Sequence, residues 1–593
     1  MKLFSLHTLG LAVAIALGAA LRFWNLDVKP LWLDETITAL ASLGRSYNEI
    51  PLGMPFSLST LKQIFTLQSA ATCPQIAQIV ITQSNHPPLF FCLEHAWLNW
   101  LGFSVWNLRA LPALMGVVGI AALYCLNRLA FSPAAGLMGA AIMAVSPFGV
   151  YLSQEARHYT LPIVLTTLAL FCLVLIQQDL KQRQRVRTPI WLGWMAINSL
   201  GFYIHYFCIL AFVAQVITLI CLFSDQRQTI PFRQWKALGL ATGGVICSHL
   251  LWLPVLLDQR DRPGTDWINF DSTSWFNYLE PVARILAGLS TMTIVLPIES
   301  QPSWIVIPVA VVMVLFVTCL GWWVFQGLKQ LWFNPETHLP TFILISFTSC
   351  ALLENLAFPY ILHQDITIGF RYNFTYYPGV CALLGASLVS LPSRYLKPGK
   401  DLVSYYFRIS RQRQIQILVL LVGILSSTFV VFDLAFQKPF YLEQAARKLI
   451  LADSTAQLTS TAAQREPILV AMAYNNFLDV VIGLSYALEI HKIQLSSSQP
   501  DTNVEVYLTF LKHSQGIETF RTELLRNRQR YNDPLKIWLV GPQLFADTKP
   551  LIKAPAIVST LTTTGCTPDP GQSYASFGVP FQLYRCPSKP RIS

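Results

Sequence analysis

Two adjacent carboxylates near the start of the chain could act as a general base or hold a cation. Asp34 and Glu35 lie in the segment 32–40, shortly after a first apolar run. Asp is also a good helix N-cap, and Glu in a first turn favours the positive end of the helix dipole. Because neighbouring residues on a helix point about 100° apart, one carboxylate could face a site while the other caps the helix. The sequence leaves both readings open.

The remaining candidates are basic, acidic and aromatic residues in short polar segments between apolar runs. Each has an ordinary explanation, such as an Arg that snorkels at a membrane surface. The segment 153–159 is less ordinary, because a short turn between two membrane helices seldom contains so many polar and ionisable groups. Arg suits phosphate, since its planar group stays charged and can bind two oxygens at once. The candidates are His86, Arg109, Glu155, Arg157, His158, Tyr159, His205, Arg371 and Tyr372.

Composition places most of the chain in a membrane. Of its 593 residues only 12% are charged and 53% are hydrophobic, and the mean hydropathy is +0.46. A typical soluble domain has about 25% charged residues. The net charge of +11 would suggest nucleic acid only if the basic residues formed one soluble face. Here they lie between apolar runs, which indicates membrane topology instead.

Eleven apolar runs are long enough to predict membrane-spanning helices, which need about 20 such residues. The first could be a cleaved signal peptide, but we favour a retained helix that holds the acidic segment in place. Two further pieces, 87–101 and 276–298, are expected to be interfacial or re-entrant. The eleven runs are residues 4–22, 109–130, 133–150, 159–177, 189–204, 206–223, 237–257, 303–326, 340–359, 373–391 and 415–436.

The basic residues set the orientation of these helices. Four connecting loops contain 14 Lys and Arg against four acids, and positively charged loops face the cytoplasm. The N-terminus is therefore expected inside, and the segments that carry the candidate residues outside. The four loops are 177–188, 224–236, 327–338 and 392–414.

The chain is expected to form two domains. Residues 1–436 form the transmembrane module, with a first outer loop at 24–108, and residues 437–593 form a small extracytoplasmic α/β domain. The tail alternates helical stretches with short strand-like runs. Cys566 and Cys586 stand apart from the other cysteines and could pair there, because the compartment outside the cytoplasm is oxidising.

On this topology all candidate residues reach the outer face at membrane depth, where one pocket could hold them. Such a pocket would combine a carboxylate with cationic groups beside lipid. This suits a substrate with a polyisoprenoid tail and an anionic phosphate.

The same residues resemble the C-type glycosyltransferases, in particular the protein O-mannosyltransferase and aminoarabinose lipid A transferase branch. The matching motifs occur in family order over about residues 1–390, and 437–593 gains little from the comparison. One departure is that the aminoarabinose branch has Lys-Pro at His86-Pro87, and neutral His lacks the fixed charge of Lys. The motifs are Leu33-Asp34-Glu35, His86-Pro87-Pro88-Leu89, Leu108-Arg109-Ala110-Leu111-Pro112, Ser153 to Tyr159, His205-Tyr206-Phe207 and Arg371-Tyr372.

The resemblance implies inverting transfer of a sugar from a polyprenyl-phosphate or polyprenyl-diphosphate carrier to an acceptor hydroxyl outside the cytoplasmic membrane. Asp34 matches the family's acidic residue and is expected to be the base, with Glu35 orienting it or contacting a metal. Arg371, with Arg157 or Arg109 and His86, would bind the donor phosphate. Glu155, His158, Tyr159, His205 and Tyr372 would line the pocket. A divalent cation bridging the two acids and the phosphate is compatible with this reading but is not demanded by any spacing.

Two other functions fit an eleven-span chain. A transporter or flippase of lipid-linked saccharides would be expected to show internal repeats and ionisable groups near mid-membrane. A noncatalytic scaffold that displays the tail would not depend on Asp34. The motif order favours the enzyme, acting on an extracytoplasmic glycan, lipid or protein and not on nucleic acid.

Overall fold

The protein is described here by a computed structural model, whose described residues form two compact units. One unit comprises residues 1–27, 80–94 and 106–437, and the other 28–79, 95–105 and 438–593. The first outer loop therefore contributes most of its length to the second unit. Described are residues 6–225, 230–260, 268–270, 274–391, 402–438, 441–451, 466–496, 504–512, 517–531, 534–541, 561–562, 565–576 and 579–587.

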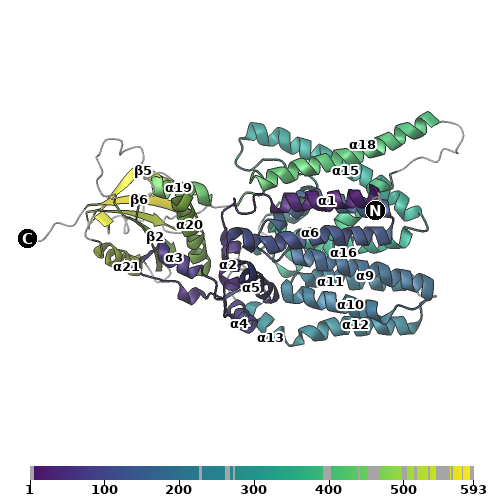
Figure 1. Ribbon diagram of the computed structural model, residues 1–593, viewed down its shortest axis with the longest axis horizontal. Coiled ribbons are helices and arrows are strands. Elements are labelled where there is room, and N and C mark those ends of the chain that lie inside the picture. The colour runs from purple at the N-terminus through teal and green to yellow at the C-terminus, as the bar shows by residue number, and fades with distance from the viewer. Residues whose placement is uncertain are drawn as a thin grey trace, which may run out of the picture. The chain divides into compact units, whose positions relative to one another are not determined.

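The first unit is built from helices, and its long apolar helices run side by side (Figure 1). They are α1 (Leu6–Phe23), α6 (Val105–Ala130), α7 (Pro133–Val145), α8 (Pro147–Ser153), α9 (Thr160–Arg183), α10 (Thr188–Ile204), α11 (Cys208–Asp225), α12 (Phe232–Leu250), α13 (Leu253–Arg260), α14 (Glu280–Thr291), α15 (Ser303–Phe333), α16 (His338–Leu362), α17 (Tyr377–Val389) and α18 (Leu402–Val431), with the short helices η3 (Ile366–Ile368) and η4 (Phe370–Thr375).

The predicted polytopic helical fold is confirmed. Within the described residues, seven helices are long and apolar enough to cross a membrane, and two bent pairs bring the number to nine if each pair is one span. The bent pairs are α7 with α8 and α12 with α13. The other two predicted runs coincide with α10 and α17, which have 17 and 13 residues. All eleven predicted runs therefore overlap a helix or a bent pair. The loop 392–414, which was expected to face the cytoplasm, lies partly outside the described residues.

The break between α7 and α8 follows from the sequence. Ser146 ends α7 with an extended backbone, and Pro147 begins α8. Helical backbone is disfavoured before Pro, and Pro is well suited to the first position of a new helix. The hydroxyl of Ser146 accepts a hydrogen bond from the Gly149 N–H (3.4 Å) and donates one to the Met292 carbonyl (2.8 Å). The result is a 59° bend that ends in the polar turn 154–159.

The two apolar pieces that were expected not to span contain short helices. The first contains α5 (Leu89–Leu101, 13 residues) and the second contains α14, with 12 residues. At 1.5 Å per residue each is about 20 Å long, too short for the hydrocarbon core. The helix α5 is divided between the two units, and α4 (Cys73–Gln83) is divided in the same way.

The second unit contains a six-stranded sheet in the order β1-β3-β2-β4-β6-β5. The strands β2, β3 and β4 are parallel, whereas β1, β6 and β5 pair antiparallel with their neighbours. β2 is buried along nearly its whole length, as expected for a central parallel strand. The strands are β1 (Phe56–Ser57), β2 (Ile468–Tyr474), β3 (Val506–Lys512), β4 (Leu535–Val540), β5 (Thr567–Ser576) and β6 (Val579–Cys586).

Helices connect the parallel strands, and the predicted α/β tail is therefore confirmed. α20 (Phe477–Ser496) links β2 to β3, and α21 (Ile517–Gln529) links β3 to β4. The tail also contains α19 (Leu442–Leu451), which packs on α20. The first outer loop adds α2 (Leu33–Ser42), η1 (Tyr47–Glu49), β1 and α3 (Leu58–Ile64) to this unit. Sequence reasoning did not find β1, which has only two residues.

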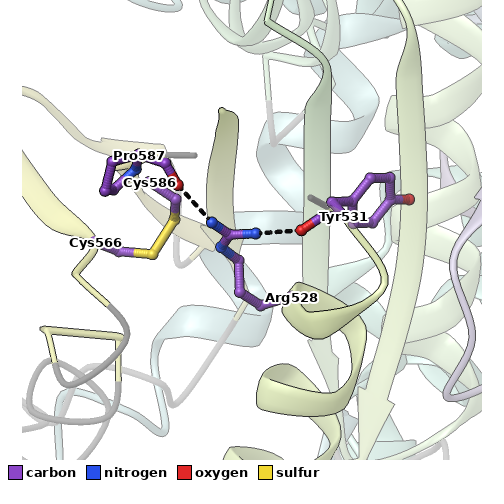
Figure 2. Close-up of a disulfide and its surroundings, with 5 residues drawn as sticks. All are labelled: Arg528, Tyr531, Cys566, Cys586 and Pro587. Atoms are coloured by element: carbon purple, nitrogen blue, oxygen red, sulfur yellow. Dashed lines mark hydrogen bonds between the residues drawn. A yellow bond between two sulfur atoms is a disulfide. The ribbon is translucent and has the colours of Figure 1, made fainter. Parts of the chain in front are cut away.

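A disulfide joins Cys566 to Cys586, as the sequence allowed (Figure 2). The Arg528 guanidinium lies beside it and donates to the Pro587 carbonyl, at 2.7 Å, and to the Tyr531 carbonyl, also at 2.7 Å. The bridge and the arginine together fix the end of β6 against the loop that follows α21.

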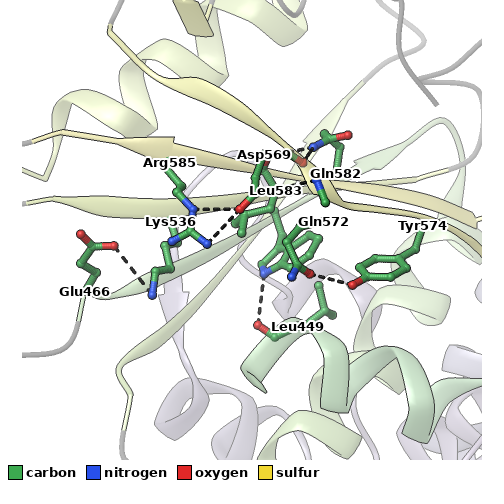
Figure 3. Close-up of polar contacts among 11 residues, drawn as sticks. Leu449, Glu466, Lys536, Asp569, Gln572, Tyr574, Gln582, Leu583 and Arg585 are labelled. Carbon is green, nitrogen blue, oxygen red and sulfur yellow. Dashed lines mark hydrogen bonds and ion pairs between the residues drawn. The ribbon is translucent and has the colours of Figure 1, made fainter. Parts of the chain in front are cut away.

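Polar contacts fasten the far edge of the sheet (Figure 3). Arg585 on β6 pairs with Asp569 on β5 at 2.9 Å, and the Trp538 indole donates to the Leu449 carbonyl at 3.1 Å. These contacts hold β5 and α19 on the sheet. They are structural and bring together none of the residues expected to act in chemistry.

Candidate active site

Four short connections between helices of the first unit converge and bring together most of the basic residues predicted from the sequence. They are the turn before α5, the turn between α8 and α9, the turn between α10 and α11, and η4 before α17. Their side chains form what we call the histidine–arginine cluster, defined as His86, Arg157, His158, His205 and Arg371.

The three imidazoles of the cluster lie against one another. The ring centre of His158 is 5.0 Å from that of His86 and 4.6 Å from that of His205, and the rings of His86 and His205 are 6.2 Å apart. His158 is fully buried and His205 is 5% exposed, whereas His86 is partly buried. Residues more than a hundred positions apart in the chain thus meet at one point.

The two arginines flank the imidazoles. The Arg157 guanidinium is buried, donates to His86 Nε2 at 2.9 Å and lies 5.7 Å from the ring centre of Tyr159. The Arg371 guanidinium lies 5.3 Å from the ring centre of Tyr372. Cation–π contacts of this kind help hold an arginine while leaving N–H groups for another acceptor.

Several imidazole nitrogens are left for a ligand. Within the described part of the chain, neither ring nitrogen of His158 has a hydrogen-bond partner, and neither does Nε2 of His205. The Phe207 backbone N–H donates to His205 Nδ1 at 3.0 Å, so the neutral ring carries its proton on Nε2. His205 therefore presents a buried N–H donor to the cluster. A buried polar group without a partner is costly, and a native structure usually keeps one for a reason.

Burial and the charges of two arginines act on the three imidazoles. Burial lowers the pKa of His86, His158 and His205 well below its ordinary value. The charges of Arg157 and Arg371 lower the pKa of each imidazole further. The imidazoles are therefore neutral at pH 7 and act as hydrogen-bonding groups, while the arginines supply the charge. This combination is suited to an anion.

Aromatic side chains surround the cluster. Tyr159 is fully buried with its ring centre 4.9 Å from that of His158, and Tyr372 packs on the Phe207 ring at 4.8 Å. From α5, the Phe90 ring lies 5.6 Å from His158. Tyr159 and Tyr372 were both predicted as pocket residues, and the structure places them beside the cluster. Apolar rings lower the local dielectric constant, which strengthens electrostatic interactions between the groups that they surround.

Arg109 and Glu155 lie near the same helix ends. Arg109 is 1% exposed and donates to the Leu26 carbonyl at 2.8 Å, so it fastens the chain that leaves α1. Glu155 is 4% exposed, and its carbonyl accepts a hydrogen bond from the Arg157 N–H at 2.7 Å. Glu155 therefore shapes the turn that carries Arg157 and His158.

The predicted catalytic pair lies in the second unit, on the first turn of α2. Trp32 and not Asp34 is the N-cap residue of this helix. The Glu35 carboxylate accepts from the Trp32 N–H at 3.5 Å, and Glu35 is buried. The N-cap role that we considered for Asp34 thus belongs to Trp32, whose N–H donates to Glu35, and Asp34 is only partly buried.

No group of three or more His, Cys, Asp or Glu side chains suited to a metal ion occurs within the described residues. The pair Asp34 and Glu35 could at most supply two ligands, with the rest coming from a substrate phosphate or water. A divalent cation stays a prediction.

Sequence reasoning missed Arg22, a buried cation in α1. Arg22 donates to the Met143 carbonyl at 2.8 Å and to the Ala144 carbonyl at 2.9 Å, both in the last turn of α7. Gln154, the first residue after α8, donates to the carbonyls of Leu21 and Trp24 at 3.2 and 2.9 Å. The end of α1 thus clamps the broken helix on which the turn 154–159 depends. An Arg so close to the end of a span could have suggested this role.

Comparison with known proteins identifies the fold. Residues 85–252 match the family model of dolichyl-phosphate-mannose-protein mannosyltransferase. The structure of ArnT from Cupriavidus metallidurans in the apo state matches with a TM-score of 0.51 over 97% of both chains, at 12% sequence identity. The chain therefore has the same overall fold as ArnT. The same ArnT bound to undecaprenyl phosphate matches with a TM-score of 0.50, also over 97% of both chains at 12% identity.

The predicted resemblance to the C-type glycosyltransferases is therefore confirmed. The segment that matches the family model contains all cluster residues except Arg371. No curated protein sequence matches the chain significantly. The structural likeness extends through the second unit, since the match covers nearly the whole chain.

Proposed function

We propose that this protein is an inverting glycosyltransferase that transfers a sugar from a polyprenyl-phosphate carrier to an acceptor hydroxyl outside the cytoplasm. The observation that carries the proposal is the histidine–arginine cluster, in which two arginines flank three imidazoles. In the described structure both ring nitrogens of His158 and Nε2 of His205 lack hydrogen-bond partners. Phosphate oxygens would accept from the His205 Nε2–H and from the one ring N–H of neutral His158, beside the charges of the two arginines. The C-type fold and the family match of residues 85–252 supply the reaction class.

The reaction needs little from the cluster beyond stabilising charge. The acceptor oxygen forms a bond to the anomeric carbon on the face opposite the phosphate, and the bond from that carbon to the phosphate oxygen breaks. The electron pair stays on the phosphate, whose charge changes from −1 to −2. Arg157 and Arg371 stabilise that charge, and the His205 Nε2–H donates to one of its oxygens. Groups held in place before the reaction are the most effective at this task.

Asp34 is our candidate for the base that takes the proton from the acceptor hydroxyl. The candidate rests on the resemblance of Leu33-Asp34-Glu35 to the family motif and on the place of Asp34 in the first turn of α2. Glu35 is buried and accepts from the Trp32 N–H, and we propose that it fixes the turn that carries Asp34. Positioned base catalysis contributes about 100- to 10,000-fold.

We further propose that the protein lies in the cytoplasmic membrane with its N-terminus inside. The 14 Lys and Arg in the loops expected inside support this orientation. The disulfide between Cys566 and Cys586 supports an extracytoplasmic second unit, since disulfides persist in oxidising compartments. The acceptor is a glycan, lipid or protein on that side.

Binding of undecaprenyl phosphate to the full chain in detergent tests the phosphate site. We expect the lipid to raise the melting temperature of the wild type, and Arg157→Ala to weaken its binding by at least tenfold. Arg447→Ala is the matched control, because Arg447 pairs with Glu443 on the exposed face of α19. Equal binding by Arg157→Ala and the control would refute the assigned site.

Transfer activity distinguishes an enzyme from a transporter. Membranes with the protein are incubated with labelled polyprenyl-phosphate mannose, a probe chosen from the family match, and free polyprenyl phosphate is measured. We expect release of the carrier together with label in an acceptor. Movement of intact donor across vesicle membranes without cleavage would favour the transporter and refute the proposal.

A further inference from the structure

His86 occupies the position at which the resemblance led us to expect a phosphate ligand, but its hydrogen bonds suggest another role. Its Nε2 lies 2.9 Å from Nη2 of Arg157, and its Nδ1 lies 3.0 Å from the Ser84 hydroxyl oxygen. A guanidinium has no acceptor and stays protonated, so Nε2 must accept from Arg157. The ring proton is then on Nδ1, which donates to Ser84. His86 is thus held as one neutral tautomer.

A chain of hydrogen bonds fixes Ser84 in turn. The Gln259 side-chain amide donates to the Ser84 carbonyl at 3.0 Å, and the Tyr206 hydroxyl donates to Gln259 Oε1 at 2.5 Å. Gln259 is 3% exposed. These contacts connect α13 and the turn before α11 to the turn that carries His86, so the imidazole is anchored on the side facing away from Arg157.

The charges around His86 favour the same neutral state. The groups that act on it are Arg157 from the turn before α9 and Arg371 from η4, and both disfavour a second ring proton. The neighbouring rings of His158 and His205 are themselves neutral for the same reason. A protonated His86 would have no lone pair for Arg157 and would repel it.

We propose that His86 is a positioning residue whose Nε2 holds the Arg157 guanidinium, and that it does not itself bind the donor phosphate. The inference rests on the proposed function of the cluster. The hydrogen bond from Nη2 to His86 fixes the direction of the planar guanidinium fork, which is the group that we propose contacts the phosphate. A Lys at this position, as in the aminoarabinose branch, could contact phosphate but could not accept from Arg157.

Two substitutions of opposite chemistry test the inference in the full chain. In His86→Gln, the side-chain carbonyl reaches the position of Nε2 and accepts from Arg157. We therefore expect its affinity for undecaprenyl phosphate and its KM for the sugar donor to stay within about threefold of wild type. In His86→Lys, a cation replaces the acceptor. Losing a charge-assisted hydrogen bond and gaining repulsion should weaken binding by about 10- to 100-fold and raise the donor KM more than it lowers kcat.

The pH dependence gives a second readout that a purely structural role would not change. Because the pKa of His86 is held well below its ordinary value by burial and the arginine charges, His86 gains a proton and loses its role as the acceptor of Arg157 only in acid below that value. Wild-type binding should therefore parallel that of His86→Gln near neutral pH and fall more steeply at the acid end of the range in which both proteins stay folded. The titrations of the lipid phosphate, His158 and His205 are common to both proteins and cancel in the comparison. Identical pH profiles would overturn the inference.

The outcomes separate the two proposals. If the wild type fails to bind undecaprenyl phosphate, the proposed function fails and the inference with it. If His86→Lys binds as well as wild type while His86→Gln does not, His86 contacts the phosphate directly and only the inference fails. Equal binding by both folded variants would also overturn it. Melting temperatures measured without lipid identify a variant that does not fold. In that case His86→Asn takes its place, and the pH comparison tests the inference.

Discussion

Replacing Arg371 with Gln should weaken phosphate binding and change the pH response of the cluster at the same time. Arg371 lies on η4, with its guanidinium against the Tyr372 ring, and its charge acts on all three imidazoles. A hydrogen bond to a charged group contributes about 1.5–3 kcal/mol. Losing it should raise the Kd of undecaprenyl phosphate by about 10- to 150-fold. Arg371→Lys should fall between, because it keeps the charge but not the planar fork.

The pH response follows from the same charge. The imidazole pKa values are lowered in the folded protein, so the unfolded chain binds more protons below about pH 6.5 and stability falls as the pH drops through that range. Without the Arg371 charge the pKa values are lowered less. The melting temperature of Arg371→Gln should therefore decrease less than that of wild type once the pH is low enough for the folded protein to begin protonating these rings.

Thermal melting of the purified protein in detergent, with and without lipid, measures both effects. Arg447→Ala again serves as the control and should match wild type in both. A variant with unchanged Kd and the same slope of melting temperature against pH would show that Arg371 acts neither on the phosphate nor on the imidazoles.

Three further predictions concern other parts of the chain. Asp34→Asn should lower transfer by about 100- to 10,000-fold while leaving undecaprenyl phosphate binding intact; full activity would exclude Asp34 as the base. Cys566→Ser should lower the free energy of unfolding of the second unit by roughly 3 kcal/mol, since the disulfide joins two residues 20 positions apart and closes that loop. Urea unfolding measures this loss, and the wild type under reducing conditions is the comparison. Gly149→Ala should lower the free energy of unfolding by about 1–3 kcal/mol, because the added Cβ would lie 2.4 Å from the Tyr377 hydroxyl. Gly193→Ala is the control, since its Cβ would meet nothing within 4 Å, and it should leave the melting temperature unchanged or raise it.

The membrane helices could be predicted because the signal is local. A run of about 20 apolar residues has few alternatives in lipid, so each predicted run overlaps a helix. The boundaries of the two units could not be predicted in this way, because β1 at Phe56–Ser57 pairs with residues 507–508 and so joins the C-terminal sheet. Two residues carry no periodicity, and a pairing across about 450 positions is not visible in one sequence.

Parts of the cluster were visible in the sequence as residue types, but not as contacts. His86, Arg157, His158, His205 and Arg371 stood out because polar groups are costly beside lipid. Their hydrogen bonds depend on how four turns meet, which no local pattern specifies. The capping of α2 shows the same limit: Trp32 is the N-cap because of its backbone conformation, although its residue type does not favour that position.

The neutral state of His86 suits a site that must bind the product phosphate more strongly than the donor phosphodiester. In the proposed reaction the phosphate charge grows from −1 to −2 as the bond to the sugar breaks. Two arginine charges match the final state better than the initial one, so their stabilisation increases along the reaction, which is the condition for catalysis. A Lys at position 86 would add a third fixed charge, but it would remove the acceptor of Arg157 and repel its guanidinium. His86 instead orients Arg157 without adding charge, so the two arginines keep the placement that favours the charge of the transition state.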